Sequence, residues 1–257
     1  RLDEGAVPQD MRSAVLSPAD AWGLVGSQTS LYMQDVARGA YRAGDIGTVA
    51  GVSTAMDQNI RMHTNGAAAG GGLVNGANQN VTYATSKDTN TQSLITDDWT
   101  ASTTFKAGDV FTIASVYAVN PQTRESTGSL FQFVALSSST ATTTATVTVA
   151  PIYSANHALA TVNSLPANGK AVVFVGAASS QYAQNLVFHK NAFALVMADL
   201  EMPDGAVFKA RESQNGYSMR VIKYYDGEMD EEKIRLDVLY GVKAIYPDLA
   251  TRLSGTT

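Results

Sequence analysis

The residue types that most often carry chemistry are scattered through this sequence of 257 residues. The three histidines, His63, His157 and His189, are far apart, and none has another metal-ligating residue type two to four positions after it. His189 follows Phe188 and precedes Lys190, which is typical of a structural side chain at a strand end or a helix start. No Gly-x-Ser-x-Gly turn occurs, and no serine is placed against a histidine and an acid. We therefore expect no catalytic residue and no enzymatic activity.

The densest group of carboxylates contains Glu228, Asp230, Glu231 and Glu232. Clustered acids can ligate calcium, but this run lacks the alternating acids, the glycine at the sixth position and the final glutamate of a calcium loop. The run is more typical of a solvated hairpin tip, or of a contact with basic residues of a neighbouring molecule. We expect no metal site.

Two other stretches contain residue types that could bind a ligand. Asp97, Asp98, Trp99 and Phe105 combine carboxylates with aromatic rings, as sugar-binding sites do, but Trp99 also fits a buried plug in the core of a β domain, which we favour. The glycines in residues 44–51 resemble a nucleotide-binding loop in spacing alone, because no Lys followed by Ser or Thr completes it. We expect no cofactor.

The composition sets broader limits. Charged residues make up 16% of the chain, below the roughly 25% of an average domain, and the formal net charge is −5 without a cluster of Lys and Arg. This balance argues against a dedicated surface for nucleic acid or an anionic membrane. The absence of cysteine excludes disulfides, cysteine-based zinc sites and thiol nucleophiles, and no apolar run reaches the roughly 20 residues of a membrane span. A weakly charged surface suits proteins that are covered by copies of themselves, and it also suits secreted β proteins.

The last third of the chain contains the longest strand patterns. Residues 217–225 and 234–245 alternate apolar and polar side chains, and the acidic run lies between them, which predicts a long antiparallel hairpin. In the second strand, Ile234 and Leu236 belong to an alternating set that also contains Val238, Tyr240 and Val242, and we expect this face to be buried. Arg235 and Asp237 should then lie on the solvated face. Residues 202–205, Met-Pro-Asp-Gly, predict a tight turn.

The first part of the chain predicts a short strand and two helices. Residues 12–16 favour a strand, and Ser17, followed by proline, is a good N-cap for a helix that would end near Gly26. Residues 30–42 have helical spacing, and residues 44–60 predict a strand, a turn and a strand.

The middle of the chain predicts an all-β domain. Residues 66–80 are rich in Gly and Asn and are typical of a linker. Short strands are expected at residues 110–119, 130–136, 145–149 and 171–175, with a polar loop at 121–128 and a mobile Ser/Thr loop at 137–144. Strands of this number and length indicate a barrel or a sandwich of roughly a hundred residues.

Several segments, in order, resemble the major capsid (coat) proteins of tailed bacteriophages, and in particular the short-tailed-phage type with an inserted β-barrel. The C-terminal segments are NLVFHKNAF, ADLEMPDG and YSMRVIKYYDGEMDEEKIRLDVLYGVKAIYPDLATRL. VPQDMRSAVLSP and GDIGTVAGVSTAMDQNI resemble the axial domain of that family, and GDVFTIASVYAVNPQTRESTGSLFQFVAL resembles its inserted domain. The N-terminal arm, the extended loop and the long spine helix of the family are not recognisable in this sequence.

The resemblance implies an α+β fold. It consists of an axial core of helices and mixed sheet (residues 1–64 and 184–257) interrupted by a Greek-key-like all-β barrel (residues 65–183). The implied function is self-assembly into an icosahedral shell around double-stranded phage DNA, with the protein located in the virion after assembly in the bacterial cytoplasm. The implied partners are further copies of the chain, scaffolding and portal proteins, and DNA that is enclosed without sequence-specific binding; no membrane partner is expected.

Seven residues are candidate contacts between subunits: Pro121, Arg124 and Glu125 in the polar loop, and Glu228, Asp230, Glu231 and Arg235 in the hairpin. An alternative is a secreted β-rich module that binds glycans or acts as an adhesin. It would explain the Ser/Thr-rich strands but not the RLDVLYG segment or the helical pattern near the N-terminus. A hydrolase is a third possibility, and it lacks a catalytic constellation.

Overall fold

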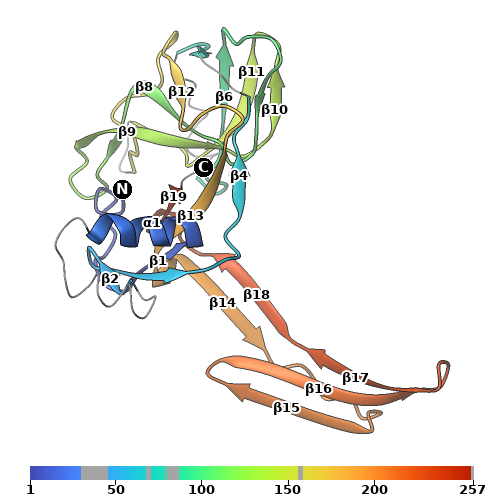
Figure 1. Ribbon diagram of the computed structural model, residues 1–257. Helices are drawn as coiled ribbons and strands as arrows, with labels where there is room; N and C mark the ends of the chain where they lie inside the picture. The colour runs from blue at the N-terminus through green and yellow to red at the C-terminus, as the bar shows by residue number, and fades with distance from the viewer. Residues whose placement is uncertain (30–45, 68–70, 78, 80–86, 156–158, 256–257) are drawn as a thin grey trace. The chain divides into compact units, whose positions relative to one another are not determined.

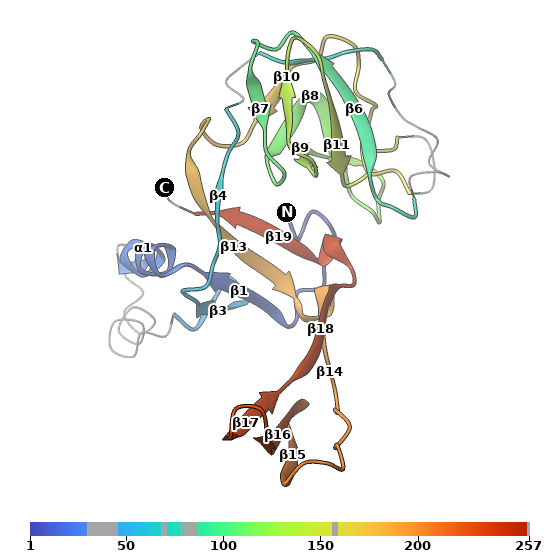
Figure 2. The same cartoon turned by 90° about the vertical axis from the view of Figure 1, so that its right-hand side faces the viewer.

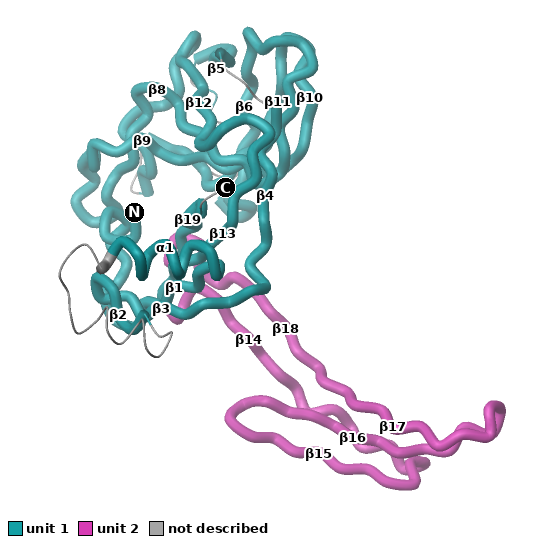
Figure 3. Tube along the Cα trace, in the orientation of Figure 1, with its two compact units in different colours: residues 1–189, 250–257 teal, residues 190–249 magenta. Residues whose placement is uncertain are grey.

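The computed structural model describes residues 1–29, 46–67, 71–77, 79, 87–155 and 159–255. The chain forms two compact units: unit 1 comprises residues 1–189 and 250–257, and unit 2 comprises residues 190–249 (Figure 3). The described part is mostly β-structure with one α-helix, α1 (Pro18–Thr29). The expected helical core is therefore not evident there, and the second predicted helix, residues 30–42, lies outside the described residues.

A mixed sheet lies at the base of unit 1. Its strands, in spatial order, are β19 (Ala250–Ser254), β13 (Gln181–His189), β1 (Arg12–Leu16), β3 (Val52–Met56) and β2 (Thr48–Val49), and β4 (Met62–Thr64) pairs with β13. β1 runs parallel to β3 and antiparallel to β13, so this sheet is mixed, as the resemblance implies. The strand–turn–strand pattern is also confirmed, because β2 and β3 form an antiparallel pair.

Helix α1 begins as its sequence predicts. The amide of Asp20 donates to Ser17 Oγ at 3.3 Å, and Ser17 Oγ donates to Asp20 Oδ2 at 2.6 Å. The helix continues past Gly26, the predicted end, to Thr29. It is held on the sheet by its buried Ala21 and Val25, which pack with the buried apolar residues Leu16 and Ile46.

The rest of unit 1 is a nearly closed six-stranded barrel (Figures 1 and 2). Its strands, in spatial order, are β12 (Val172–Phe174), β8 (Val110–Val119), β9 (Ser126–Ala135), β11 (Ala145–Ala150), β6 (Gln92–Asp97) and β5 (Leu73–Val74). The barrel approaches closure where the Val74 amide donates to the Lys170 carbonyl at 2.9 Å and the Val172 amide donates to the Gly72 carbonyl at 2.8 Å. The four strands predicted in this region are thus confirmed.

Aromatic and aliphatic side chains fill the barrel. Trp99, Phe105, Phe111, Phe133 and Tyr153 are all buried in one apolar cluster, and Trp99 is only 4% exposed. The interpretation of Trp99 as a core plug is therefore confirmed, and a sugar cannot stack on a ring so enclosed.

The Ser/Thr tract was predicted to be a mobile loop, and this prediction is wrong in its centre. Residues 139–141 form β10 (Ser139–Ala141), which pairs with β7 (Thr103–Phe105) beside the barrel. Ala141 is fully buried in the barrel cluster, and this tertiary contact fixes the tract despite its loop-like composition.

Unit 2 contains a two-stranded ribbon and a three-stranded sheet. The ribbon pairs β14 (Phe193–Ala198) with β18 (Leu239–Ala244), and the sheet has the order β15 (Phe208–Gln214), β16 (Tyr217–Asp226), β17 (Glu231–Asp237). Single turns of 3-10 helix, η1 (Lys190–Ala192) and η2 (Pro247–Leu249), lie at its two ends. The hairpin of β16 and β17 is confirmed, whereas the predicted second strand divides at Val238 into β17 and β18.

The prediction of which hairpin face is buried was wrong. Ile234 and Leu236 share a face, as the alternation requires, but they are 70% and 65% exposed, and Val238, Tyr240 and Val242 are exposed as well. The opposite face is the covered one. It contains Ile222, which is 7% exposed and pairs with Arg235.

The segment before β15 explains this reversal. Pro203, Gly205 and Ala206 line a shallow pocket together with side chains of β16 and β17, and Arg220 donates to the carbonyl of Glu201. This segment lies over the face that the sequence marks as polar, because hydrogen bonds hold it there. Alternation predicts which side chains share a face, but it does not predict which face another segment will cover.

Candidate interaction surfaces

A buried carboxylate with several hydrogen bonds lies where the barrel meets the base of unit 1. Asp109 is 1% exposed and follows a turn that enters β8. Its carboxylate accepts hydrogen bonds from the Lys106 amide at 2.8 Å and the Gly66 amide at 3.2 Å, and its Oδ1 lies 2.8 Å from His63 Nε2. Hydrogen bonds from three donors offset the free-energy cost of removing this carboxylate from water. The group therefore stabilises the structure.

Arg252 of β19 completes this junction. Its Nη2 donates to the Gly108 carbonyl at 2.9 Å, and its Nη1 donates to Gln184 Oε1 at 3.1 Å. Burial lowers the pKa of Arg252, and the nearby charge of Asp109 opposes that shift. We call His63, Asp109 and Arg252 the polar junction; it fastens the start of β8 to the strands of the basal sheet.

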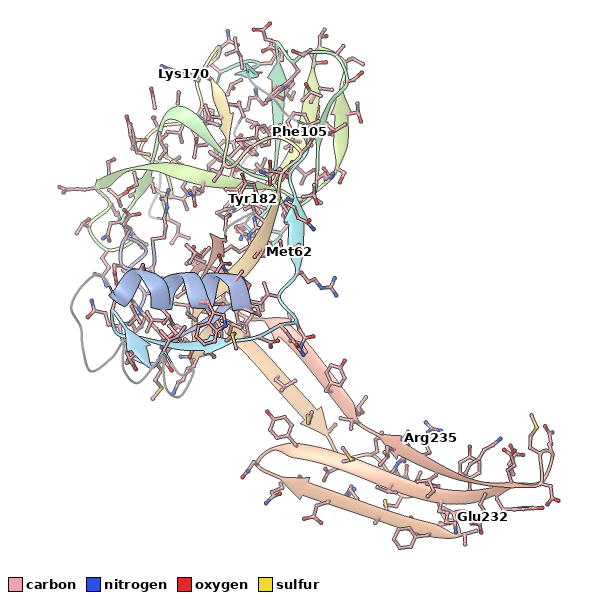
Figure 4. The ribbon with its side chains drawn as sticks, viewed as in Figure 1. Met62, Phe105, Lys170, Tyr182, Glu232 and Arg235 are labelled. Atoms are coloured by element: carbon pink, nitrogen blue, oxygen red, sulfur yellow. The ribbon has the colours of Figure 1, made fainter. Side chains whose placement is uncertain are left out.

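A pair of chain segments enters and leaves the barrel beside the polar junction. Met62 of β4 pairs with Ala183, and Tyr182 of β13 lies opposite His63; Figure 4 labels Met62 and Tyr182 on these neighbouring strands. Farther along, the Asn65 amide donates to the Ser180 carbonyl at 2.9 Å. The barrel is thus inserted between two paired strands of the basal sheet.

None of the polar junction was predicted from the sequence. His63 was assigned to no site, and Asp109 lies just before the strand predicted at residues 110–119. The residues that meet there are 46 positions apart for His63 and Asp109, and 144 positions apart for Gly108 and Arg252. A turn that ends in an aspartate signals local capping, but partners at these separations have no local signal.

The polar loop brings the first three predicted contact residues together. Pro121, Arg124 and Glu125 are all exposed and lie in the turn between β8 and β9. Asn120 shapes this turn: its carbonyl accepts from the Arg124 amide at 2.8 Å, and its amide donates to the Glu125 carbonyl at 3.0 Å. Its side-chain Oδ1 also accepts from the Gln122 amide at 2.8 Å. The turn is ordered by its own backbone, which leaves its charged side chains exposed.

The hairpin tip in unit 2 brings together Glu228, Asp230 and Glu231, all of which are exposed. Asp226, at the end of β16, accepts from the Glu228 amide at 3.1 Å and from the ammonium of Lys233. The hydrogen bond from Lys233 is the main reason why the pKa of Asp226 is lowered. The tip is therefore a closed, acidic turn, as the solvated-tip interpretation predicted.

Arg235 lies on β17, away from the tip and on the covered face of the sheet (Figure 4). Its Nε donates to Asp237 Oδ1 at 2.6 Å, and Arg220 Nη2 donates to Asp237 Oδ2 at 2.5 Å. These two guanidinium groups, Arg220 first, hold the pKa of Asp237 below its usual range. Arg235 is thus engaged within its own chain, although its side chain is still 63% exposed.

The other face of the three-stranded sheet is apolar, and it contains Ile234 and Leu236, which were expected to be buried. Phe208, Met219, Ile234 and Leu236 are all exposed, and the strand register places them on one face. The exposed ion pair between Lys223 and Glu232 crosses the same face, with Nζ 2.5 Å from Oε2. The alternating pattern signalled this face correctly, but its exposure depends on what covers it.

The other two histidines are not part of the polar junction. His189 is buried at the end of β13, with Nε2 3.7 Å from Asp10 Oδ1, and His157 lies outside the described part. Among the residues that the structure describes, no three His, Asp or Glu side chains are grouped so that they could hold a metal ion. No described helix has the length and apolar character needed to cross a membrane.

Three comparisons relate this chain to known proteins. The family described as "P22 coat protein - gene protein 5" matches residues 1–255. The "Major capsid protein" of Acyrthosiphon pisum secondary endosymbiont phage 1 is 27% identical over an alignment of 257 positions, which covers 94% of this chain and 60% of that protein. A solved structure, "CUS-3 coat protein I-domain", is 23% identical, with a TM-score of 0.31, over 40% of this chain and 93% of that one. The chain thus spans about three-fifths of the length of the capsid protein it matches.

Proposed function

Because this chain belongs to the P22 coat protein family, we propose that it is part of a major capsid protein that assembles into the icosahedral shell around double-stranded phage DNA. The observation that carries the proposal is the family match, which extends over residues 1–255 and leaves no room for a second, unrelated domain in that span. The role is structural rather than enzymatic. Its location would be the virion, after assembly in the bacterial cytoplasm.

The surface of the chain supports this role. Shell subunits make many modest contacts, and symmetry repeats each contact through the particle. Unit 2 exposes a face with Phe208, Met219, Ile234 and Leu236, which is unusual for a protein that works as a monomer. The chain also has few charges for its length, which suits a surface that is largely covered in an assembly.

We assign three parts to the chain within this function. Residues 1–64 and 184–257 would form the axial core, and residues 65–183 would be the inserted β domain. The pairing of β4 with the start of β13 supports these boundaries to within a few residues, since the two paired segments lie at the two ends of the insertion. The order β8, β9, β11, β6 supports a Greek-key-like barrel. Within this sheet β6, β8, β9 and β11 follow one another in sequence, and the first of them lies beside the last.

The proposed partners are further copies of the chain, a scaffolding protein and a portal protein, with DNA enclosed rather than read. We assign contacts between subunits to the polar loop (Pro121, Arg124 and Glu125) and to the hairpin (Glu228, Asp230, Glu231 and Arg235). The exposure of the loop and the tip supports this assignment. Arg235 is the weakest member, because its guanidinium already binds Asp237.

The test is assembly of the full-length protein that contains this chain, produced with the scaffolding protein of the same phage. We expect closed shells by sedimentation and electron microscopy. A monomer that binds members of a glycan array would instead support the secreted module. Arg124→Ala with Glu125→Ala in the full-length protein should lower shell yield without lowering the melting temperature, and Asp88→Ala, an exposed acid away from the loop, is the control.

A further inference from the structure

Among the described residues, hydrogen bonds join the barrel to the rest of unit 1 at two places of opposite character. One is the polar junction, where Asp109 is buried and receives three hydrogen bonds. The other is an exposed contact between the N-terminal segment, residues 1–11, and strand β9 of the barrel. The two sides of this second contact are distant in sequence, since Glu4 and Ser129 are 125 positions apart.

The exposed contact depends on a few polar groups. Ser129 Oγ donates to Glu4 Oε1 at 2.7 Å, and Arg1 Nη2 donates to the Leu130 carbonyl at 2.6 Å. Arg1 and Glu4 also form an ion pair at 3.5 Å, with side chains 35% and 37% exposed. Ion pairs this accessible contribute little and are screened by salt.

The N-terminal segment is itself bound firmly to the basal sheet. Arg12, the first residue of β1, is buried, and its guanidinium donates to the carbonyls of Pro8 at 2.8 Å and Val7 at 2.6 Å. It also pairs with Asp3 at 2.7 Å, and the side chain of Leu2 is buried. The segment is therefore part of the basal sheet's structure, and its contact with β9 bridges the sheet to the barrel.

We propose that residues 1–11 act as a releasable strap on the barrel. When the contact between this strap and β9 opens, the barrel pivots about the polar junction. The order of events follows from burial. Opening the exposed contact returns its groups to water. Opening the polar junction would instead leave the Asp109 carboxylate and its donors buried without hydrogen-bond partners. The contact between the strap and β9 therefore opens first, while the hydrogen bonds of the polar junction remain formed.

The geometry of the remaining attachment suits a pivot. Once the strap is open, the polar junction and the paired strands beside it join the barrel to the sheet at one location. Asn65 Nδ2 bridges the two strands there by donating to the carbonyls of Val175 at 3.1 Å and Ala177 at 3.2 Å. Gly176, between them, has a positive φ of 90°, the conformation in which glycine is preferred. A single attachment of this kind resists separation but permits rotation.

Distance measurements between spin labels test this proposal in the 257-residue chain. The sequence has no cysteine, so Ser53→Cys on β3 and Ser93→Cys on β6 provide two unique labelling sites, both exposed. The strap variant combines Arg1→Ala, Glu4→Gln and Ser129→Ala. Its matched control, Arg124→Ala, Glu125→Gln and Ser126→Ala, makes the same exchanges in the β8–β9 turn and at the first residue of β9.

We expect one narrow distance for the unmodified chain and for the control, and a shifted, broader distribution for the strap variant. Ser129→Ala alone removes the hydrogen bond to Glu4 and should broaden the distribution in the same direction, but less. A distribution that stays narrow in both the strap variant and Ser129→Ala overturns the proposal. If the strap variant loses its thermal transition, Ser129→Ala decides. Because the readout is made on the isolated chain, it does not depend on shell assembly.

Discussion

Gly72 lies against the ring of Trp99 so closely that a Cβ atom on Gly72 would be 2.0 Å from Cζ2 of the indole. The ring cannot retreat easily, because its Nε1 donates to Thr96 Oγ1 at 2.8 Å and it packs against Phe105 in a T-shaped arrangement, with 4.9 Å between ring centroids. The absent side chain of Gly72 is thus a requirement of the barrel core.

Gly72→Ala should therefore destabilise the barrel by roughly 3 kcal/mol or more, at the upper end of overpacking substitutions. Gly23→Ala is the matched control: Gly23 is exposed within α1, and a Cβ there meets nothing within 4 Å. That exchange should raise stability by about 0.5–1 kcal/mol, because alanine is the better helix former. Urea unfolding followed by tryptophan fluorescence measures both. Equal effects of the two exchanges would show that the Trp99 ring moves aside at no cost.

The polar junction gives a second prediction. Asp109→Ala leaves the amides of Lys106 and Gly66 without their acceptor, so it should cost on the order of 3 kcal/mol. Asp109→Asn should cost less, because its amide oxygen can still accept from Lys106 and Gly66 while its NH2 group faces His63 Nε2. Asp88→Ala, at an exposed ion pair with Lys87, should stay within about 0.5 kcal/mol in the same urea titration. A small effect of Asp109→Ala would mean that water can replace the carboxylate.

Much of the fold could be predicted because it depends on local patterns. The strand predicted at residues 110–119 has the same bounds as β8, since its alternation is long and its ends are marked by turns. The cap at Ser17 is likewise local, because its partner Asp20 is three residues away. The junction of Asp109 with His63 and Arg252 could not be predicted, because its members meet only after the barrel has folded.

Burial was the least predictable property. The alternating pattern assigned Ile234 and Leu236 to one face, and the strand register confirms that they share it. The pattern could not show that the segment containing Pro203 would cover the other face. Composition misled in the same way at residues 139–141, where Ser and Thr suggested a loop. There the burial of Ala141 in the barrel cluster outweighs the low strand signal.

Tyr153 predicts how the barrel responds to alkaline pH. Burial raises the pKa of its phenol from 10.0 to about 12, and its hydroxyl donates to the Gln79 carbonyl at 2.7 Å. A raised pKa means that the folded state favours the neutral phenol. The stability linked to Tyr153 is complete below pH 10 and is lost as the pH rises through about 12, by roughly 2–3 kcal/mol. Unfolding free energies measured between pH 9 and about 12 should fall more steeply for the unmodified chain than for Tyr153→Phe, which has no phenol to ionise. Parallel curves would contradict this.

The last prediction concerns the two faces of the hairpin in unit 2. Ile222 is 7% exposed and Leu236 is 65% exposed, although both are large apolar side chains on neighbouring strands. Ile222→Ala removes packing beneath the segment that contains Pro203, so it should cost about 2–4 kcal/mol. Leu236→Ala removes a side chain that is mostly in water already, and it should cost less than about 1 kcal/mol, mainly through the lower strand preference of alanine.

Because unit 2 is compact by itself, hydrogen exchange of the β16 amides reports its local opening separately from the rest of the chain. Faster exchange for Ile222→Ala and nearly unchanged exchange for Leu236→Ala would agree with the assignment of faces. The reverse order would place the covered surface on the Leu236 side and restore the burial that alternation alone suggests.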